Sequence, residues 1–278
     1  MSLPAFRTLK VAVDAATGVA AVQLCRPAVS NALSLDAFAE LEQCFSCLGA
    51  SSDVRCVLLS GEGNHFCSGI DLSVLATLEN RSSAISCPAR RAASLADQIR
   101  GLQRALTAVE TCRVPVVAAI HGVCLGGGLD LACCCDVRYA TKDASFCVLE
   151  IEVGLTADLG VLSRLPGIVG EGRARELALT ARRFDGIEAA VVGLVSTQLF
   201  DDREALMSAA LTVAVRMAGC SPVAVQGTKK VMLHSRDRSV SEGLEYVALL
   251  NAGQLVSSDL SECADARREK RRPIFAKM

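Results

Sequence analysis

The sequence predicts an α/β protein with one principal core and a helical C-terminal region. Short apolar runs typical of strands recur up to residue 201, in a strand-strand-helix order rather than in strict alternation of strands and helices. Glycine-rich loops follow two of the buried strands. From about Asp202 onward, every apolar pattern has the helical period. We therefore expect residues 1–201 to form the core and residues 202–278 to form a helical region.

The composition fits a globular protein without a strong charge bias. Of 278 residues, 51% are hydrophobic and 21% are charged, and the net charge is -1, so nucleic acid is not an expected partner. Charged residues interrupt the first 25 positions, which predicts neither a secretory signal nor a membrane span. We expect a soluble protein made in the cytosol. Its 14 cysteines should be reduced and mostly buried, and Cys133-Cys134-Cys135 has no second Cys/His pair that would indicate a metal site.

The N-terminal stretch from Val11 to Cys25 predicts two strands. Apolar residues alternate or run continuously there, and Thr17-Gly18 breaks them as a hairpin turn would. A helix should follow, because Ser34 is a suitable N-cap and an apolar stripe with near-helical spacing comes next: Leu33, Phe38, Leu41, Phe45 and Leu48.

A buried strand and a long helix are predicted further along the chain. Cys56 to Ser60 contains a short aliphatic run that ends at Gly61, as expected for a strand covered on both faces. Ser82 to Ala89 has the composition of a surface loop. The periodic apolar residues after it predict a helix from about Ala92 to Glu110.

The central third repeats the pattern of strand, glycine loop and helix. Val114 to Ile120 predicts a second buried strand, and it leads through Gly122 into a triple glycine and a helix that begins near Asp130. Shorter patterns predict strands at Val137–Tyr139 and Ser145–Cys147 and helices at Leu162–Leu165 and Ala174–Leu179.

The C-terminal region predicts three amphipathic helices without an interior proline: Ala205–Ala218, Pro222–Ser235 and Ser241–Leu255. The basic run from Arg267 to Arg272 is interpreted as a solvated helix end.

Two loops carry residues suited to acyl chemistry. They are Ser68-Gly69-Ile70-Asp71-Leu72, which follows the first buried strand, and Gly126-Gly127-Gly128-Leu129-Asp130, which follows the second. A proton beside a thioester carbonyl becomes acidic when two backbone N–H groups stabilise the enolate oxygen, and loss of one such donor costs about 3 kcal/mol. Small residues let the acyl group approach those donors.

With these loops in this order, the chain resembles the enoyl-coenzyme A hydratase/isomerase superfamily, also called the crotonase family, over almost its whole length. Further stretches carry the resemblance: Arg26-Pro27, Asn31-Ala32-Leu33, Pro115 to Gly122, Cys135-Asp136, Glu150 to Gly160 and Ser221 to Ala224. The resemblance implies a crotonase-like ββα spiral core and a C-terminal helical trimerisation region, hence a homotrimer or a dimer of trimers. It also implies a coenzyme A thioester as substrate and no added cofactor.

The resemblance also implies roles for the loop residues. The oxyanion donors are expected to be the N–H groups of Ser68 and Gly127. Substrate contacts are expected from Ser68, Gly69, Ile70, Asp71, Leu72, Gly126 and Gly127, chiefly through backbone groups.

Three acids bear on the choice of reaction. Hydratases of this superfamily usually carry two glutamates, whereas here the first position is Asp130, one methylene shorter, and the second is Glu150. A third acid, Asp158, stands where many hydratases are glycine-rich. This set resembles that of Δ3,5-Δ2,4-dienoyl-coenzyme A isomerases, which act in fatty-acid β-oxidation. Moving a proton from carbon 2 to carbon 6 needs two separated acids, so we assign Glu150 as base, Asp158 as acid and Asp130 as a positioning or polarity-setting partner.

Alternatives exist for each acid and for the function. Asp130 could cap the helix after the glycines, Glu150 could be a solvated strand-end acid with Glu152 as its rival, and Asp158 could be a loop or N-cap residue. A 2-enoyl-coenzyme A hydratase, a 3,2-enoyl-coenzyme A isomerase and a non-catalytic scaffold are the competing functions.

The last three residues, Ala276-Lys277-Met278, are a variant of the small-basic-aliphatic peroxisomal address. They favour a peroxisome-like organelle, with a mitochondrial or cytoplasmic location as the alternative.

Overall fold

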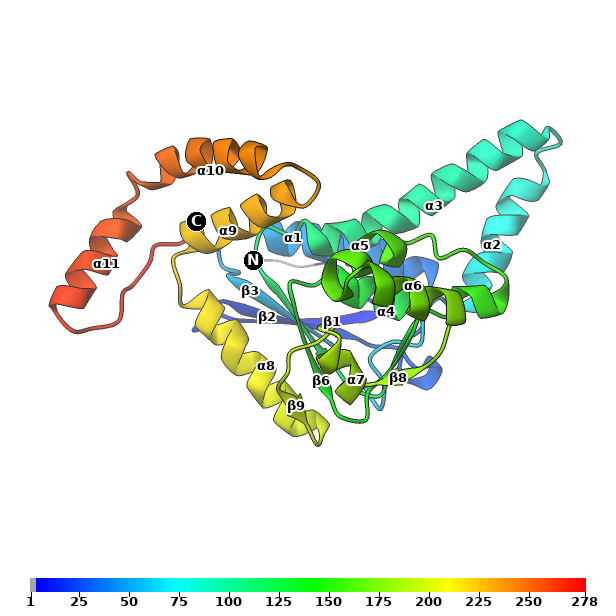
Figure 1. Ribbon diagram of the computed structural model, residues 1–278, viewed down its shortest axis with the longest axis horizontal. Coiled ribbons are helices and arrows are strands. Elements are labelled where there is room, and N and C mark those ends of the chain that lie inside the picture. The colour runs from blue at the N-terminus through cyan, green and yellow to red at the C-terminus, as the bar shows by residue number, and fades with distance from the viewer. Residues whose placement is uncertain (1–3) are drawn as a thin grey trace.

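Two β-sheets form the frame of the computed structural model, which describes residues 4–278 (Figure 1). The larger sheet has the order β1-β2-β3-β4-β6-β9 and is parallel except for the β1–β2 hairpin. Its strands are β1 (Leu9–Asp14), β2 (Val19–Leu24), β3 (Cys56–Gly61), β4 (Val116–Ile120), β6 (Val137–Thr141) and β9 (Leu199–Phe200). The smaller sheet contains β5 (Val123–Leu125), β7 (Ser145–Cys147) and β8 (Phe184–Asp185).

The chain winds between the two sheets as a spiral. The units β4-β5-α4 and β6-β7-α5 each give one strand to the larger sheet, one to the smaller sheet and then a helix. The core helices are α1 (Leu35–Ala50), α2 (Leu72–Ser83), α3 (Pro88–Glu110), α4 (Gly127–Cys133), α5 (Val161–Val169), α6 (Glu171–Thr180) and α7 (Gly186–Val191). The predicted strand-strand-helix repeat and the ββα spiral fold are thus confirmed.

The larger sheet is covered on both faces, which explains its continuous apolar strands. In β3, Val57 and Leu59 belong to the main core cluster together with residues of α1 and α3. Their neighbours Cys56 and Leu58 point to the opposite face and pack in a cluster that includes residues of α8 (Arg203–Ala218). Each large apolar side chain buried in this way contributes about 1.5–3 kcal/mol.

The helix α8 therefore belongs to the core, although the predicted boundary after residue 201 lies before it. The remaining helices, α9 (Pro222–Ser235), α10 (Val240–Gln254) and α11 (Ser258–Arg268), extend from the core as an arm (Figure 1). Their N-termini carry the polar caps Ser221, Ser239 and Ser257. Beyond α11, Arg271 pairs with Glu262 at 2.5 Å, so part of the basic run is neutralised locally.

For the chain between β3 and β4, the predicted surface loop and helix start were partly wrong. Leu72–Ser83 forms the helix α2, so the connecting loop contains only residues 84–87 and α3 already begins at Pro88. Asp71 caps α2 by accepting a hydrogen bond from the Ser73 N–H at 3.1 Å. The other helices and strands that the sequence did not predict are β5, α7, β8, β9 and α11.

The cysteines and the longer helices add two facts about the described residues. Cys133, Cys134 and Cys135 are buried in the core, as expected of structural thiols. Within residues 4–278 no single helix has the length and hydropathy to cross a membrane, and the bent pair α8 and α9, at 106°, meets that test by length and composition only.

Candidate active site

The two predicted loops are brought together by a short backbone ladder. The N–H of Cys67 donates to the Val123 carbonyl at 3.0 Å, and the N–H of Leu125 donates to the Cys67 carbonyl at 3.0 Å. The first loop therefore runs beside β5 as an extra parallel strand. Because the chain leaves this ladder at Ser68 on one side and at Gly126 on the other, both loops emerge at the same place.

The glycines allow this close approach. A Cβ added at Gly128 would lie 2.5 Å from the Cys67 carbonyl oxygen, which is far inside van der Waals contact. Gly126 has φ +47°, and a Cβ there would lie 3.3 Å from Oε1 of Glu150. The triple glycine is thus required by tertiary contacts with the first loop and with a predicted catalytic acid.

The structure corrects one predicted oxyanion donor. The N–H of Ser68 donates to the Ser30 carbonyl at 2.9 Å, so it is not available to a substrate. The N–H of Ile70, in contrast, has no hydrogen-bond acceptor among the described residues, and its nitrogen lies 3.4 Å from the Cβ position of Gly127. Gly127 is the first residue of α4, where a backbone N–H lacks an intrahelical partner. Ile70 and Gly127 therefore each present a free N–H group, one from each loop.

Buried polar contacts hold the first loop in place. Asn31 is 2% exposed, and its side-chain amide donates to the carbonyls of Glu62 and His65 at 2.9 and 2.8 Å. The carboxylate of Asp71 accepts from Ser73 and pairs with Arg26 at 2.9 Å, and these contacts lower the pKa of Asp71. The Asp71 side chain thus orders its loop, and the substrate contacts predicted for Ser68 to Leu72 stay a prediction.

Asp130 is fully buried inside α4 and does not cap it, because the N-cap is Gly126. Its Oδ1 accepts a hydrogen bond from the Val161 N–H at 2.6 Å, at the start of α5. Burial, followed by the charge of Glu150, raises the pKa of Asp130 to about 7. A proton is therefore retained on Asp130 well above the ordinary range of an aspartic acid.

The raised pKa predicts a pH-dependent effect of Asp130→Asn. The unfolded chain has an aspartate pKa of about 4, so between about pH 4 and pH 7 the native state retains a proton that the unfolded state has lost. Wild-type stability should fall as pH rises through this window. Asparagine keeps an acceptor for Val161 and carries no charge, so the stability of Asp130→Asn should not fall in this window.

The difference in unfolding free energy between Asp130→Asn and the wild type should therefore grow in favour of the variant by a few kcal/mol between about pH 5 and about pH 8, as measured in urea titrations. An advantage that is constant with pH would contradict the raised pKa.

Glu150 is the first residue of a short 3-10 helix (Glu150–Val153) that follows β7. The Gly126 N–H donates to the Cys147 carbonyl at 3.0 Å, and this bond places the end of β7 beside the glycine loop. Burial raises the pKa of Glu150, and the neighbouring carboxyl group of Asp130 lowers it. A proton held on Asp130 thus favours the ionised form of Glu150. Glu152, the rival acid, is exposed.

Asp158 lies in the turn before α5, between the buried residues Ala157 and Leu159. It does not cap the helix, because Gly160 is the N-cap. Within residues 4–278, no other residue donates a hydrogen bond to its carboxylate. Partial burial raises the pKa of Asp158, and its charge in turn raises the pKa of Glu150 and of Asp130. The three predicted acids are therefore close enough to influence one another.

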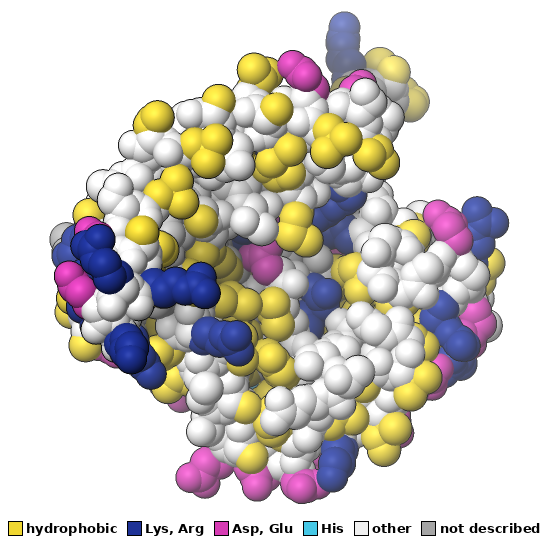
Figure 2. Space-filling model, turned by 60° about the vertical axis from the view of Figure 1, so that its left-hand side comes forward, with side chains coloured by type: hydrophobic (Ala, Val, Ile, Leu, Met, Phe, Trp, Pro, Cys, Tyr) yellow, Lys and Arg dark blue, Asp and Glu magenta, His cyan; other side chains and the backbone are white. Residues whose placement is uncertain are grey.

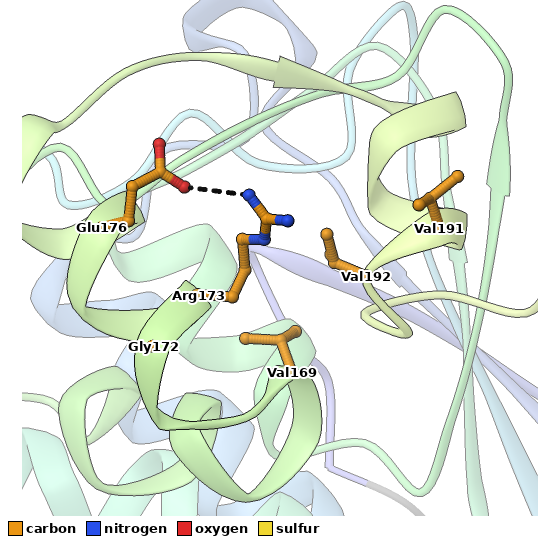
Figure 3. Close-up of a pocket in the computed structure, with 6 residues that line it drawn as sticks. All are labelled: Val169, Gly172, Arg173, Glu176, Val191 and Val192. Carbon is orange, nitrogen blue, oxygen red and sulfur yellow. Dashed lines mark hydrogen bonds and ion pairs between the residues drawn. The ribbon is translucent and has the colours of Figure 1, made fainter.

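A surface hollow elsewhere in the core contains none of these residues. It lies between α6 and α7, has a volume of about 490 Å³ and is lined by Val169, Gly172, Arg173, Glu176, Val191 and Val192 (Figure 3). Arg173 is paired with Glu176 across 3.4 Å on the same helix. The candidate site therefore consists of the glycine loops and the three acids, and this hollow is not part of it.

Comparison with known proteins agrees with the geometry. The profile of the enoyl-CoA hydratase/isomerase family matches residues 14–278. The chain is 46% identical over 279 residues to the peroxisomal Δ(3,5)-Δ(2,4)-dienoyl-CoA isomerase of Arabidopsis thaliana, with full coverage of both chains. It is 43% identical over 251 residues to the mitochondrial enzyme of that name from Mus musculus, covering 90% of this chain and 76% of the mouse chain.

The fold also matches a crystal structure of an enoyl-CoA hydratase from Bacillus anthracis, with a TM-score of 0.86 and 29% identity over 98% of this chain and 100% of that one. With both sequence and fold matched over nearly the entire length, the chain belongs to the enoyl-CoA hydratase/isomerase family.

Proposed function

We propose that the protein converts 3,5-dienoyl-CoA to 2,4-dienoyl-CoA in fatty-acid β-oxidation. The observation that carries this proposal is the grouping of Asp130, Glu150 and Asp158 beside two loops with free backbone N–H groups. The identity to two dienoyl-CoA isomerases over most of the chain supports the same reaction.

The proposed mechanism uses two acids and two backbone donors. Ionised Glu150 removes a proton from carbon 2, and the N–H groups of Ile70 and Gly127 stabilise the resulting dienolate oxygen. Protonated Asp158 then delivers a proton to carbon 6, and the carbon–carbon double bonds shift into conjugation with the thioester. Part of the Asp158 side chain contacts solvent, so Asp158 can regain a proton there, and Glu150 must release the proton that it took from carbon 2 before the next turnover. Every step is carried by protein groups, so the mechanism invokes no added cofactor.

Asp130 sets the charge state of this site. Its bond to the Val161 N–H orients the carboxyl group, and its retained proton is available to Glu150. A hydratase would need two acids placed around one water molecule, whereas Asp130 is shorter than the usual glutamate and is fully buried. The geometry therefore favours the dienoyl-CoA isomerase over the hydratase, and the identity to named dienoyl-CoA isomerases favours it over the 3,2-enoyl-CoA isomerase and the non-catalytic scaffold.

The function is tested by an ultraviolet assay with 3,5-octadienoyl-CoA. We expect an absorption band to appear as the diene becomes conjugated with the thioester. In Glu150→Gln, the rate at which this band appears should fall by about 10²–10⁴-fold, which is the usual contribution of a general base. Crotonyl-CoA is the control substrate. Rapid hydration of crotonyl-CoA without the conjugated band would assign the protein to the hydratases instead.

We propose that α9, α10 and α11 form the contacts of a homotrimer, or of a dimer of trimers. Large apolar side chains are exposed along this arm, among them Met232, Val240, Leu244, Leu249, Leu255 and Val256. The face shown in Figure 2 is hollowed beside it, with both hydrophobic and charged side chains in and around the hollow. This hollow has a volume of about 830 Å³ and lies between α9 and the core. Apolar surface of this kind favours association.

We also propose a peroxisome-like location, on the basis of Ala276-Lys277-Met278 and of the peroxisomal relative. The mitochondrial relatives keep the alternative open, because two organelles are represented among proteins of similar sequence.

A further inference from the structure

The segment that carries Asp158 is held along one face of α3. Gln103, Thr107 and Glu110 are spaced by four and three residues, so their side chains share a face of the helix. The Gln103 amide donates to the Asp158 main-chain carbonyl at 2.6 Å. Arg164, six residues further, donates to the Thr107 hydroxyl at 3.3 Å and to the Glu110 carboxylate at 2.8 Å. One helical face thus contacts both ends of the segment 158–164.

The bond from Gln103 reaches the backbone of Asp158 itself. A carbonyl oxygen only accepts hydrogen bonds, so the glutamine must present its amide N–H to it. The Asp158 carboxylate accepts from no other residue within the described part of the chain, and its position is therefore set by its backbone. Buried Ala157 and Leu159 anchor that backbone on one side, and Gln103 holds it on the other.

The far end of the segment is fixed by Arg164. Its side chain folds back over the start of α5, where it donates to the Leu159 carbonyl at 3.3 Å and fills the space of the missing Gly160 side chain. Glu110 also pairs with Arg236, the C-cap residue of α9. Burial would raise the pKa of Glu110, but hydrogen bonds from both arginines lower it below the ordinary value, so the carboxylate stays charged and holds Arg164.

We propose that Gln103 is a positioning residue for the isomerisation: its bond to the Asp158 carbonyl, backed by the Glu110–Arg164 pair, fixes where the Asp158 carboxyl stands. This inference rests on the proposed function, in which Asp158 must reach carbon 6 while Glu150 serves carbon 2. The two reacting carbons are far apart on one rigid diene. If the segment that carries Asp158 is displaced, the proton can no longer be delivered to carbon 6 while Glu150 serves carbon 2. A misplacement of 1 Å can cost up to about 100-fold in rate.

Gln103→Met tests the proposal, because methionine has a similar length but no N–H donor. We expect kcat for 3,5-octadienoyl-CoA to fall roughly tenfold with KM within about twofold of the wild type, since the acyl contacts are untouched. Gln103→Lys restores a donor and should recover most of that loss. Gln98→Met is the matched control, because Gln98 lies on the same helix but donates to Ser82 of α2 at 2.9 Å. It should keep the wild-type kcat.

Amide hydrogen exchange over residues 155–165, without substrate, separates this proposal from the reaction itself. Gln103→Met should exchange faster there than the wild type and Gln98→Met. Unchanged exchange and an unchanged kcat would overturn the positioning role while the wild-type assay still supports the isomerase. A wild-type protein that is inactive on the diene, but whose exchange responds to Gln103→Met, would instead refute the proposed function and leave the structural bond in place. A kcat loss shared equally by Gln98→Met, or not recovered by Gln103→Lys, would also overturn the proposal.

Discussion

Asp158→Asn is expected to lower kcat for the isomerisation by 10²–10⁴-fold while the affinity for the thioester changes by no more than about twofold. Asparagine keeps the size of the side chain but cannot deliver a proton to carbon 6. Glu150 remains intact in this variant, so the dienolate should still form and return its proton to carbon 2. In deuterium oxide, Asp158→Asn should therefore exchange the carbon 2 hydrogen of the substrate without forming the conjugated product, which mass spectrometry and ultraviolet absorbance can follow together.

Glu150→Gln is the matched control for this experiment. It removes the base but keeps Asp158, so exchange at carbon 2 and formation of the product should disappear together. The opposite result, with exchange lost in Asp158→Asn and kept in Glu150→Gln, would show that the two acids have exchanged roles. Full activity of Asp158→Asn would remove Asp158 from the mechanism.

Gly128→Ala is expected to lose at least about 100-fold in kcat, the usual effect of displacing one oxyanion donor. The added Cβ would lie 2.5 Å from the Cys67 carbonyl oxygen and 2.9 Å from the Cys67 Cβ. Backbone on one of the two loops must move to relieve this overlap. The free N–H groups of Ile70 and Gly127 would then no longer point to one oxygen, and overpacking should also cost about 1–3 kcal/mol of stability.

Gly172→Ala provides the control for that substitution. Gly172 lies in the first turn of α6, and a Cβ there meets nothing within 4 Å. Its activity should equal that of the wild type and its stability should stay within about 1 kcal/mol. Steady-state kinetics and urea unfolding of both variants check the prediction, and a Gly128→Ala enzyme with wild-type kcat would show that the loops tolerate the shift.

The sequence predicted elements best where local chemistry and burial agree. The first hairpin, the Ser34 cap and the buried strands β3 and β4 all have side chains whose local preference matches the final environment. The helix α2 was not predicted, although Val74, Leu75 and Leu78 have helical spacing; of its apolar residues only Val74 is fully buried. The short elements β8, β9 and α7 depend on contacts across the fold, which a local pattern does not contain.

In the candidate site too, some residues could be predicted from the sequence and others depend on tertiary contacts. The glycine loops could be picked out because close backbone approach requires glycine, whereas the three acids were chosen by their resemblance to those of dienoyl-coenzyme A isomerases. The assignment of Ser68 as an oxyanion donor conflicts with the structure because the free N–H in that loop depends on its register against residues 30–33. Gln103 and Arg164 were missed because they act on backbone carbonyls, and that role leaves no motif in the sequence.

The ladder between Cys67 and β5 joins the two donor loops into one unit, whereas the three acids come from α4, from the turn after β7 and from the turn before α5. In the proposed mechanism, backbone groups therefore activate the thioester, and separate side chains set the destination of the proton. Point substitutions can alter the acid side chains without changing the backbone of the donor loops. A scaffold with this division of labour can acquire a new reaction through a few codon changes, which gives a physical reason for one family to contain both hydratases and isomerases.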